Sequence, residues 1–405
     1  MRILFVVPYT PNLIRVRPYN LIRALSRRGH QVTVLTLTTN DGEVEQAREL
    51  AKECQVITHP LPRWRSLANS LRALPGRAPL QAHYCWQPAL AQDLQRLASQ
   101  ANYDVVHVEH LRGARYGTFL SRQVPVAQRP PIVWDSVDCI SLLFRQAAAQ
   151  SKSAFGRLIT RLELGRTERY ESWLLPQFER ILVTSPADRQ ALSALASGLA
   201  PTAPIDVIPN GVDLQYFRPD TRELRSSNTL VLSGKMSYHA NITMALYLVH
   251  DVMPRVWAKR PDVKLTIVGK DPPREVRALA TNESIRVSGT VADVRPFLRQ
   301  AAIAVAPIRY GAGIQNKILE AMACGAPVVT TPQATTALNA TVDRDLLVAA
   351  DAPSFATAVL DLLSDKTRRE AVAAAGLNYV HTCHDWDTIT TQLEDAYISA
   401  SSRRP

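Results

Sequence analysis

Short runs of β-branched and apolar residues alternate with amphipathic stretches along the chain, and this alternation restricts the fold more than any other feature. In the first half we predict a helix over 19–28 and strands over 3–7, 31–37, 105–108, 131–134 and 180–184. In the second half we predict a helix over 241–259 and strands over 229–233, 264–268, 285–287, 302–306, 328–330 and 346–348. Strands separated by helices form βαβ units, in which the strands are parallel. The chain is therefore predicted to be an α/β protein with two parallel sheets.

The length of 405 residues favours two domains of about 200 residues each. We place the boundary in the segment 194–204, which is rich in Ala, Pro, Ser and Gly. Because both halves show the same alternation, we expect two doubly wound, Rossmann-like domains, residues 1–200 and 205–379. Ligands of such domains bind at the carboxyl ends of the strands, so we expect a cleft faced by both sheets.

The composition favours a cytoplasmic protein without disulfides. No run approaches the roughly 18 apolar residues of a membrane-spanning helix, and the apolar run in 1–8 is too short for a signal peptide. The five cysteines are scattered and no pair has CxxC spacing, so neither a disulfide framework nor a zinc site is indicated. A reducing cytoplasm is the compartment that fits these features.

The net charge of +11 is concentrated in the first half of the chain. Residues 1–200 hold 25 Lys and Arg against 15 Asp and Glu, and the remainder holds 22 against 21. This excess predicts an anionic partner, either a membrane surface or nucleic acid, unless arginine serves only for solubility. Nucleic acid is disfavoured, because no binding module or aromatic-interleaved platform occurs.

The segment 61–77 is the best candidate for a membrane contact. It combines an apolar stripe (Trp64, Leu67, Leu71, Leu74) with four arginines (Arg63, Arg65, Arg72, Arg77). A basic amphipathic helix of this kind can lie on anionic lipid. A leucine stripe can equally belong to a core, and that alternative stays open.

The strongest local signal is the block 309–329, which predicts a strand, a glycine loop, a helix and another strand. Gly311 and Gly313 permit close backbone approach, and the helix that follows offers free N–H groups, so the loop predicts a phosphate site. Asn316, Lys317 and Glu320 lie on one edge of that helix. A cation near a diphosphate and a carboxylate near ribose hydroxyls would divide the binding between them. The alternative is an ordinary strand–turn–helix with a surface Lys–Glu pair.

The sequence Gly313-Ile-Gln-Asn-Lys-Ile-Leu-Glu-Ala-Met-Ala-Cys-Gly-Ala-Pro-Val-Val329 resembles the donor-site signature of glycosyltransferase family 4. It is especially similar to bacterial exopolysaccharide and exosortase-associated sugar transferases. Three further stretches match the family in the same order: 208–213 with Phe217, 267–269, and 288–296. The first half is similar more loosely, through its opening strand, Gly29-His30 and Asp104-Val-Val-His107. The resemblance implies a GT-B fold, in which the last helix, 380–405, packs back onto the first domain.

The resemblance also implies a donor site in the second domain. Glu320 corresponds to the family's ribose-binding glutamate, the turn 287–291 to the backbone that holds the base, and Gly234-Lys235 to a Gly-Arg pair at the diphosphate. The implied donor-binding residues are Gly234, Lys235, Asn241, Gly269, Val291, Gly311, Gly313, Ile314, Gln315, Asn316, Lys317 and Glu320. We expect Lys235 and Lys317 to stabilise the charge of the leaving diphosphate. No cofactor and no obligatory metal are expected.

The chain departs from the family pattern at three places. The family's first glutamate falls at Ala312, and its second phosphate-binding lysine falls at Asn241, so we infer that Lys317 supplies the missing charge. A histidine of related enzymes falls at Glu109, next to His110. We expect Glu109 or His110 to orient the acceptor or the transferred sugar. A His/Glu pair without a third partner is weak evidence for a metal.

The loop after the first strand carries Arg15 and Arg17, where family members often have glycines. These arginines are expected to contact phosphate or an anionic acceptor, with solvated loop cations as an equal alternative.

Taken together, these features predict a retaining glycosyltransferase that moves a sugar from a nucleotide-diphosphate sugar to a lipid-linked or polysaccharide acceptor. It would work in the cytoplasm, in peripheral contact with the inner face of an anionic membrane. Two alternatives remain: a GT-B sugar-nucleotide epimerase, and a non-catalytic sugar-nucleotide-binding assembly subunit suggested by Ala312 and Asn241.

Overall fold

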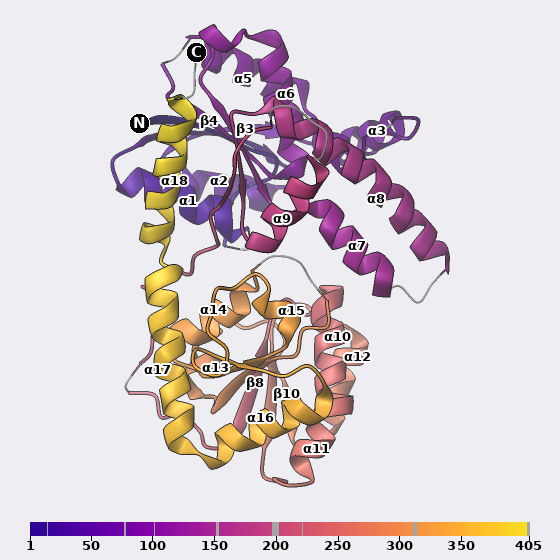
Figure 1. Cartoon of the computed structure of the whole chain (residues 1–405), viewed down its shortest axis with the longest axis vertical. Coiled ribbons are helices and arrows are strands. Elements are labelled where there is room, and N and C mark those ends of the chain that lie inside the picture. The colour runs from indigo at the N-terminus through magenta and orange to yellow at the C-terminus, as the bar shows by residue number, and fades with distance from the viewer. Residues whose placement is uncertain are drawn as a thin grey trace. The chain divides into compact units, whose positions relative to one another are not determined.

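The computed structural model describes residues 1–13, 15–76, 78–100, 102–150, 154–196, 202–220, 222–310 and 314–402. The chain forms two compact units, drawn in Figure 1. The first unit comprises Met1–Pro209 and Ile389–Pro405, and the second comprises Asn210–Thr388. The second unit is therefore inserted into the sequence of the first, and the chain passes between them at Pro209–Asn210 and at Thr388–Ile389.

The first unit is built on a parallel sheet with the strand order β3-β2-β1-β4-β5-β6-β7. The strands are β1 (Arg2–Val7), β2 (Gln31–Thr38), β3 (Gln55–Pro60), β4 (Val105–Glu109), β5 (Ile132–Val137), β6 (Arg180–Val183) and β7 (Ile205–Val207). The central strand β1 pairs with β2 and β4, and its residues from Ile3 to Val7 are fully buried. Both faces of such a sheet must be covered, which explains its continuous apolar runs.

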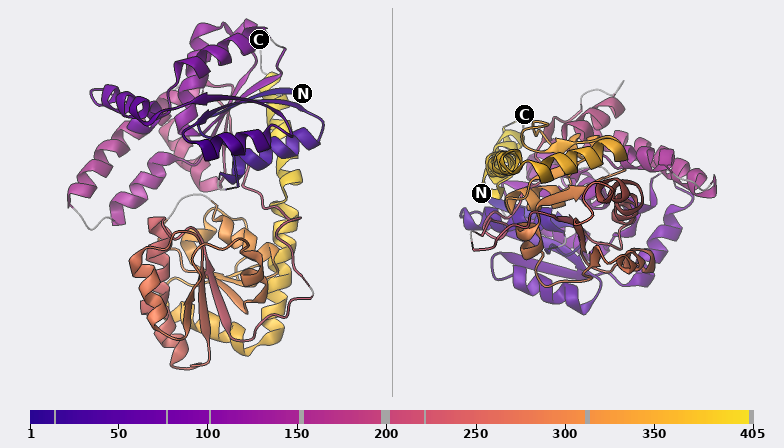
Figure 2. Two further views of the ribbon diagram at one scale, coloured as in Figure 1. Left: turned by 180° about the vertical axis from the view of Figure 1, so that it is seen from behind. Right: turned by 90° about the horizontal axis from the view of Figure 1, so that it is seen from below.

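Helices cover both faces of this sheet. Figure 1 shows α1 (Val16–Arg27) and α2 (Asp41–Leu50) on one face, and α5 (Pro88–Gln100) and α6 (His110–Gln123) on the other. The remaining helices of this unit are α3 (Arg63–Ala73), α4 (Leu80–Tyr84), α7 (Ile140–Gln150), α8 (Ala154–Leu174), α9 (Pro186–Leu195) and most of α18 (Trp386–Ser401). Helices α7 and α8 pair as a hairpin that extends away from the sheet, as both side views show (Figures 1 and 2).

The second unit repeats the doubly wound architecture with the parallel strand order β10-β9-β8-β11-β12-β13. Its strands are β8 (Thr229–Ser233), β9 (Lys264–Val268), β10 (Ile285–Val287), β11 (Ile303–Ala306), β12 (Val328–Thr330) and β13 (Leu347–Val348). Its helices are α10 (His239–Tyr247), α11 (Met253–Trp257), α12 (Arg274–Ala278), α13 (Arg295–Gln300), α14 (Asn316–Ala323), α15 (Pro332–Thr335), α16 (Ala352–Ser364) and α17 (Lys366–Cys383). Figure 1 shows α10 and α12 on one side of the sheet and α13 and α14 on the other.

The two ends of the second unit are bonded to each other. The ring of His384 lies 2.7 Å from the carbonyl oxygen of Asn210 through Nδ1 and 2.8 Å from the hydroxyl of Tyr379 through Nε2. Val212 forms a parallel bridge with Asp385, and its N–H donates to the carbonyl of His384 at 2.7 Å. A side chain at Gly211 would strike the indole of Trp386, so the two segments pack backbone against ring. The entry and the exit of this unit are thus held together locally.

Candidate active site

Two glycine turns meet at the carboxyl ends of β8 and β9 in the second unit. Gly234 follows β8 with φ +150° and Gly269 follows β9 with φ +155°. A Cβ atom at Gly269 would lie 1.7 Å from the carbonyl oxygen of Gly234, and one at Gly234 would lie 2.8 Å from Nδ2 of Asn241. Both positions therefore need glycine for space as well as for φ. The edge that the sequence predicts as the donor site is made of closely packed backbone.

Lys317 brings a cation to this edge from α14. Its Nζ donates to Oδ1 of Asn241 at 2.9 Å and to Oε1 of Gln315 at 3.1 Å. Asn241, in the first turn of α10, in turn donates from Nδ2 to the carbonyl oxygen of Lys235 at 2.9 Å. The structure thus brings together Gly234, Lys235, Asn241 and Lys317. A cavity of about 310 Å³ adjoins them, lined by Lys235, Ser237, Tyr238 and Asn241.

Burial shifts the two charged groups of α14 toward neutrality. It lowers the pKa of the Lys317 ammonium to about 8, with a small opposing effect of Glu320. It raises the pKa of the Glu320 carboxyl to about 7, and Lys317 opposes that shift. The Oδ1 atom of Asn316 is buried and has no hydrogen-bond partner among the residues that the structure describes. Such groups are costly unless a ligand satisfies them, which is what a preorganised binding site requires.

The other predicted donor-site residues contribute backbone rather than side chains. The side chain of Ile314 is buried and that of Val291 is half-buried, and both pack into the core of the second unit. Their backbone groups are therefore the parts best placed to face a ligand. Gly311 and Gly313, with Ala312 between them, lie outside the described residues.

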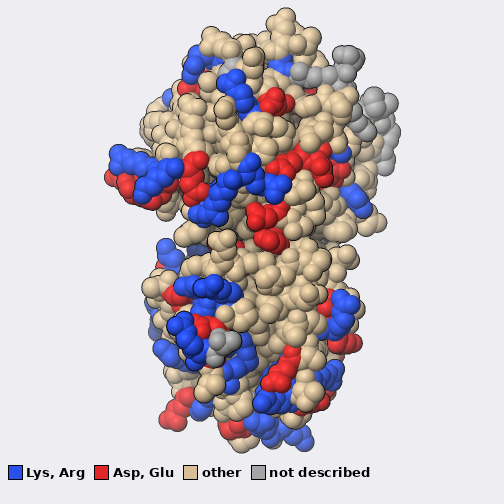
Figure 3. Space-filling model, turned by 90° about the vertical axis from the view of Figure 1, so that its left-hand side faces the viewer, with Lys and Arg blue, Asp and Glu red and all other residues tan. Residues whose placement is uncertain are grey.

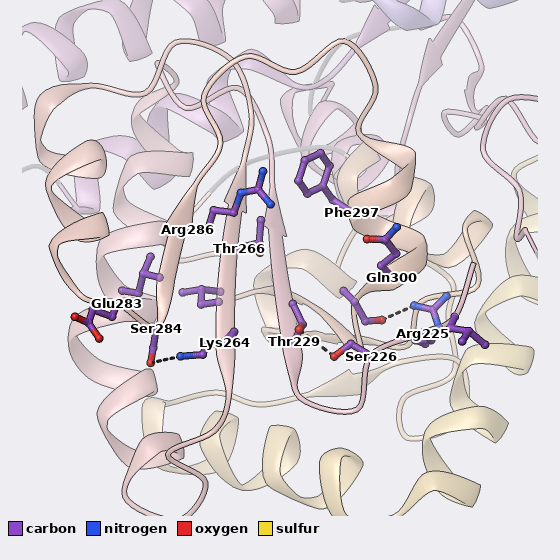
Figure 4. Close-up of a pocket in the computed structure, with 14 residues that line it drawn as sticks. Arg225, Ser226, Thr229, Lys264, Thr266, Glu283, Ser284, Arg286, Phe297 and Gln300 are labelled. Atoms are coloured by element: carbon purple, nitrogen blue, oxygen red, sulfur yellow. Dashed lines mark hydrogen bonds between the residues drawn. The ribbon is translucent and has the colours of Figure 1, made fainter. Parts of the chain in front are cut away.

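A second pocket of the same unit lies at the opposite edge of the sheet. It has a volume of about 540 Å³, and Thr229, Lys264 and Ile285 in its wall begin β8, β9 and β10. Figure 4 shows Lys264 beside Ser284, which it contacts at 3.3 Å, and the guanidinium of Arg286 over the ring of Phe297. The cations of this pocket that Figure 4 labels have protein partners, and the glycine turns are at the other end of the strands. We therefore do not assign the donor to it.

In the first unit, a buried charge network occupies the carboxyl ends of β4 and β5. The guanidinium of Arg17 forms an ion pair with Asp135 at 2.8 Å and donates to the carbonyl of Pro209 at 3.1 Å. His107 lies 3.4 Å from Glu109 and 3.7 Å from Asp135, and its Nδ1 contacts the hydroxyl of Tyr397 at 2.8 Å. Burial and the charge of Asp135 raise the pKa of Glu109. His107, Glu109 and Asp135 have the spacing of metal ligands, but the guanidinium of Arg17 already supplies a cation to this group.

This burial changes what two predicted residues can do. Glu109 is 1% exposed and Arg17 is 3% exposed. Arg17 belongs to α1 rather than to an open loop, and its guanidinium is already engaged in the ion pair with Asp135. Both side chains therefore hold the strand ends in place instead of presenting charge to a substrate.

His110 and Arg15, also predicted as site residues, are half-buried, so each keeps part of its surface exposed. His110, the first residue of α6, has φ +64°, an unusual conformation for a non-glycine residue. Burial and Arg112 lower the pKa of His110 to about 3. Arg15 packs over the ring of Tyr9 at 4.8 Å and pairs with Glu43 at 3.2 Å. Sequence reasoning did not single out Tyr9, Arg112 or Tyr397; the position of the first two just beyond predicted strand ends was the available signal.

The predicted apolar stripe of α3 lies on the surface and not in a core. Trp64, Leu67, Leu71 and Leu74 are 64%, 62%, 57% and 49% exposed, and we call them the α3 face. Arg77, predicted to flank it, lies outside the described residues. On the side of the molecule drawn in Figure 3, basic and acidic side chains are interspersed over the first unit. None of the described helices combines the length and the apolar character needed to cross a bilayer.

Two family models match successive parts of the chain. The model described as Glycosyltransferase Family 4 matches residues 15–216, and the one described as Glycosyl transferases group 1 matches residues 227–365. The chain belongs to glycosyltransferase family 4. The prediction of a glycosyltransferase is thereby confirmed.

Named relatives and solved structures agree with this assignment. The enzyme is 25% identical to the phosphatidyl-myo-inositol mannosyltransferase of Mycolicibacterium smegmatis, over 99% of this chain and 94% of that protein. It is 30% identical over 49% of its length to a GDP-mannose-dependent monoacylated alpha-(1-6)-phosphatidylinositol monomannoside mannosyltransferase of Corynebacterium glutamicum, of which it covers 56%. The structure of sucrose-phosphate synthase from Thermosynechococcus elongatus superposes with a TM-score of 0.73 at 18% identity, with full coverage of both chains. HepE of Anabaena, solved with UDP, superposes with a TM-score of 0.67 at 15% identity, covering 98% of this chain and all of HepE. The predicted GT-B fold is confirmed. The two relatives named above are mannosyltransferases, and their names do not mention the exopolysaccharide or exosortase-associated transferases to which the motif was compared.

Proposed function

We propose that the enzyme is a retaining hexosyltransferase that uses a nucleotide-diphosphate sugar and a lipid-linked or nascent glycan acceptor, in cell-envelope or exopolysaccharide biosynthesis. The observation that carries this proposal is the convergence of Lys235, Asn241 and Lys317 on the turn at Gly234. Cations beside closely packed backbone suit a diphosphate. Glu320, nearly one helical turn beyond Lys317, suits the hydroxyls of a ribose.

Retention needs no protein nucleophile in this scheme. The acceptor oxygen bonds to C1 of the sugar on the face from which the diphosphate departs. The bond from C1 to the phosphate oxygen breaks, and the acceptor proton passes to that departing oxygen. Negative charge grows on the diphosphate, and Lys235 and Lys317 stabilise it. A metal is not obligatory, and the remaining contribution of the protein is to position both substrates.

His110 is our candidate for the residue that orients the acceptor. Its Nδ1 accepts a bond from the N–H of Arg112 at 3.2 Å. The low pKa of His110 keeps the ring neutral, and the neutral ring then carries its proton on Nε2. His110 therefore offers a neutral N–H donor to an acceptor oxygen, while buried Glu109 and His107 support the strand end beneath it.

The relatives favour a hexose donor and a lipid acceptor. Their names include GDP-mannose as a donor and phosphatidylinositol and its mannoside as acceptors, and HepE was solved with UDP. We extend this chemistry to the present enzyme and propose mannose as the first sugar to test. The exopolysaccharide resemblance of the donor motif is compatible with such an acceptor, since both kinds of product are assembled at the membrane.

The composition of the α3 face favours binding of the enzyme to a bilayer surface. Four exposed apolar side chains on one side of a helix are unusual for a surface in water. Arg63, Arg65 and Arg72 accompany them on the same helix. Each basic residue near an anionic bilayer contributes on the order of 1 kcal/mol. We propose that the enzyme is cytoplasmic and binds the inner face of the membrane reversibly through α3.

A turnover assay tests the proposed reaction. GDP-mannose and UDP-glucose are each incubated with the enzyme, with and without a bacterial lipid extract, and nucleotide release and the anomeric configuration of the product are measured. We expect release that depends on the extract, with retention of configuration. Isomerised sugar without the extract would identify an epimerase. Nucleotide-sugar binding without turnover under either condition would identify a binding subunit.

A further inference from the structure

The first unit contains an arginine that the fold leaves without a partner. Arg112 lies in the first turn of α6, directly after the carboxyl end of β4. Its Nε is buried, yet the guanidinium makes no hydrogen bond, ion pair or ring contact with any residue that the structure describes. Its neighbour Arg115, by contrast, contacts Nδ1 of His83 and packs over Trp86. A buried N–H without a partner costs free energy, so a ligand is a natural explanation for Arg112.

Arg15 approaches the same place from the loop after β1. Arg112 and Arg15 both act to lower the pKa of Tyr9 and of Cys85 against the larger effect of burial, so the two guanidinium groups share these neighbours. The carboxylate of Glu43 balances Arg15 alone. The hydroxyl of Tyr9 also donates to Glu109 at 3.4 Å, and burial and the charge of Asp135 raise the pKa of that carboxyl, which disfavours its charged form. None of the carboxyls that the structure describes here forms an ion pair with Arg112, so its guanidinium stays available to a ligand beside Tyr9.

The start of α6 adds favourable polarity. The N-cap residue Glu109 makes no side-chain bond to this 14-residue helix, and the first turn has no acidic residue; the ring of His110 accepts from the N–H of Arg112 at 3.2 Å. The remaining N–H groups of the first turn and the positive end of the helix dipole lie at the carboxyl edge of the sheet. His110, at the same helix start, is the residue to which the acceptor was assigned above.

We propose that Arg112 and Arg15, with Tyr9 and the start of α6, form a phosphate-binding subsite that holds a phosphate group of the acceptor. A guanidinium donates two parallel bonds to phosphate oxygens, which suits a monoester or a diester. The subsite fixes the acceptor by its charge and leaves the reacting hydroxyl to His110. This inference rests on the proposed function only for the identity of the ligand as the acceptor.

Calorimetric titration of the full chain tests the subsite. The parent protein carries Lys235→Ala and Lys317→Ala, so that the donor site does not capture phosphate. The probes are glycerophosphoinositol, a diester, myo-inositol 1-phosphate, a monoester, and myo-inositol, which has no phosphate. We expect the parent to bind the phosphate-bearing probes and not myo-inositol. Arg112→Gln should weaken that binding roughly tenfold or more, the loss expected for one charge-assisted contact.

Two further variants sharpen the result. Arg112→Lys keeps the charge without the two-pronged geometry and should retain part of the affinity. Arg122→Gln, at the other end of α6, should bind like the parent. Binding of the diester identifies a lipid headgroup as the source of the phosphate, and binding of the monoester alone identifies a soluble phosphate ester.

The proposal is overturned if Arg112→Gln binds both phosphates as the parent does, or if myo-inositol binds equally well. Thermal unfolding provides an independent check, because a ligand-binding arginine is dispensable for the fold. Arg112→Met should unfold at the parent temperature or above it. A decrease of more than about 4 °C, equivalent to 1 kcal/mol or more, would make Arg112 a structural residue. Donor binding to the chain with Lys235 and Lys317 intact is measured separately, so failure of the subsite and failure of the donor assignment are distinguishable.

Discussion

Donor affinity should follow a bell-shaped pH profile, with its maximum between the pKa values of Glu320 and Lys317. The pKa of free Lys317 is about 8, and a bound diphosphate raises it by favouring the ammonium. Below pH 8 Lys317 is protonated in both states and adds no pH dependence. Above pH 8 the free protein loses the proton that the complex keeps. Affinity then falls up to tenfold, or about 1.4 kcal/mol, per pH unit until the pKa of the complex is reached.

Glu320 produces the opposite flank. The pKa of its free carboxyl is about 7, and hydrogen bonds from ribose hydroxyls favour the carboxylate and lower that pKa in the complex. Above pH 7 the Glu320 carboxyl is ionised both in the free protein and in the complex. Below pH 7 the free protein takes up a proton that the complex lacks, so affinity decreases as the pH falls. The optimum therefore lies between about pH 7 and pH 8.

Calorimetric titration with an intact nucleotide sugar measures this profile. A series from about pH 5.5 to about pH 10 covers roughly two pH units on either side of the optimum. A nucleotide sugar is preferable to the free diphosphate, whose terminal phosphate also titrates near neutrality. Lys317→Arg is charged throughout this range and should remove the alkaline flank only. Glu320→Gln should remove the acid flank and weaken binding at pH 7.5 by roughly 1.5–3 kcal/mol. A flat wild-type profile, or an alkaline flank that persists in Lys317→Arg, would refute the roles assigned to these two residues.

Three further predictions follow from the same structure. Lys235→Ala and Lys317→Ala should each lower turnover, and the two effects should be non-additive if both lysines contact one phosphate. Wild-type turnover in both variants would mean that the diphosphate binds elsewhere. Arg17→Ala should lower the free energy of unfolding by about 3–5 kcal/mol in urea denaturation, because it leaves Asp135 buried without its partner, whereas Arg15→Ala should cost less than about 1 kcal/mol. The double variant Leu67→Ser/Leu71→Ser should co-sediment less with anionic vesicles at low salt than the wild-type protein does. The control variant Leu224→Ser, which changes an exposed leucine of the second unit, should co-sediment like the wild type. Equal sedimentation of the wild type and both variants would mean that the α3 face does not touch lipid.

The sequence predicted the second unit more accurately than the first. Strands 229–233, 264–268 and 285–287 coincide with β8, β9 and β10, because each is rich in β-branched or apolar residues and is followed directly by Gly234, Gly269 or Ser288-Gly289. Strand β3 was missed, since Gln55–Pro60 mixes polar residues with few apolar ones, as an edge strand can. The unit boundary lies at Pro209, after the short strand β7, which follows the segment proposed as a linker.

The candidate site was predictable where its parts are local. The loop and helix around Lys317 are contiguous, and the motif identified them. The contact of Lys317 with Asn241 joins residues 76 positions apart, and the pair Arg17–Asp135 joins residues 118 apart. No local sequence pattern predicts that the side chain of Arg17 is buried, because only the tertiary fold brings Asp135 beside it. The same reason explains why Arg112 was overlooked: its lack of a partner is a property of the packed structure.

The bonded ends of the second unit have a consequence for how this enzyme could be rebuilt. Asn210 is hydrogen-bonded to His384, and Val212 forms a bridge with Asp385. The two ends of the segment Asn210–Thr388 are therefore adjacent in space. Domains with adjacent termini tolerate excision and insertion, since neither join has to span the body of the domain. The second unit, to which we assign the donor, can therefore be exchanged as one segment. If the proposed donor site is right, grafting the matching segment of a relative between Pro209 and Ile389 should change the sugar nucleotide that is used and should leave Arg112 and the α3 face in place.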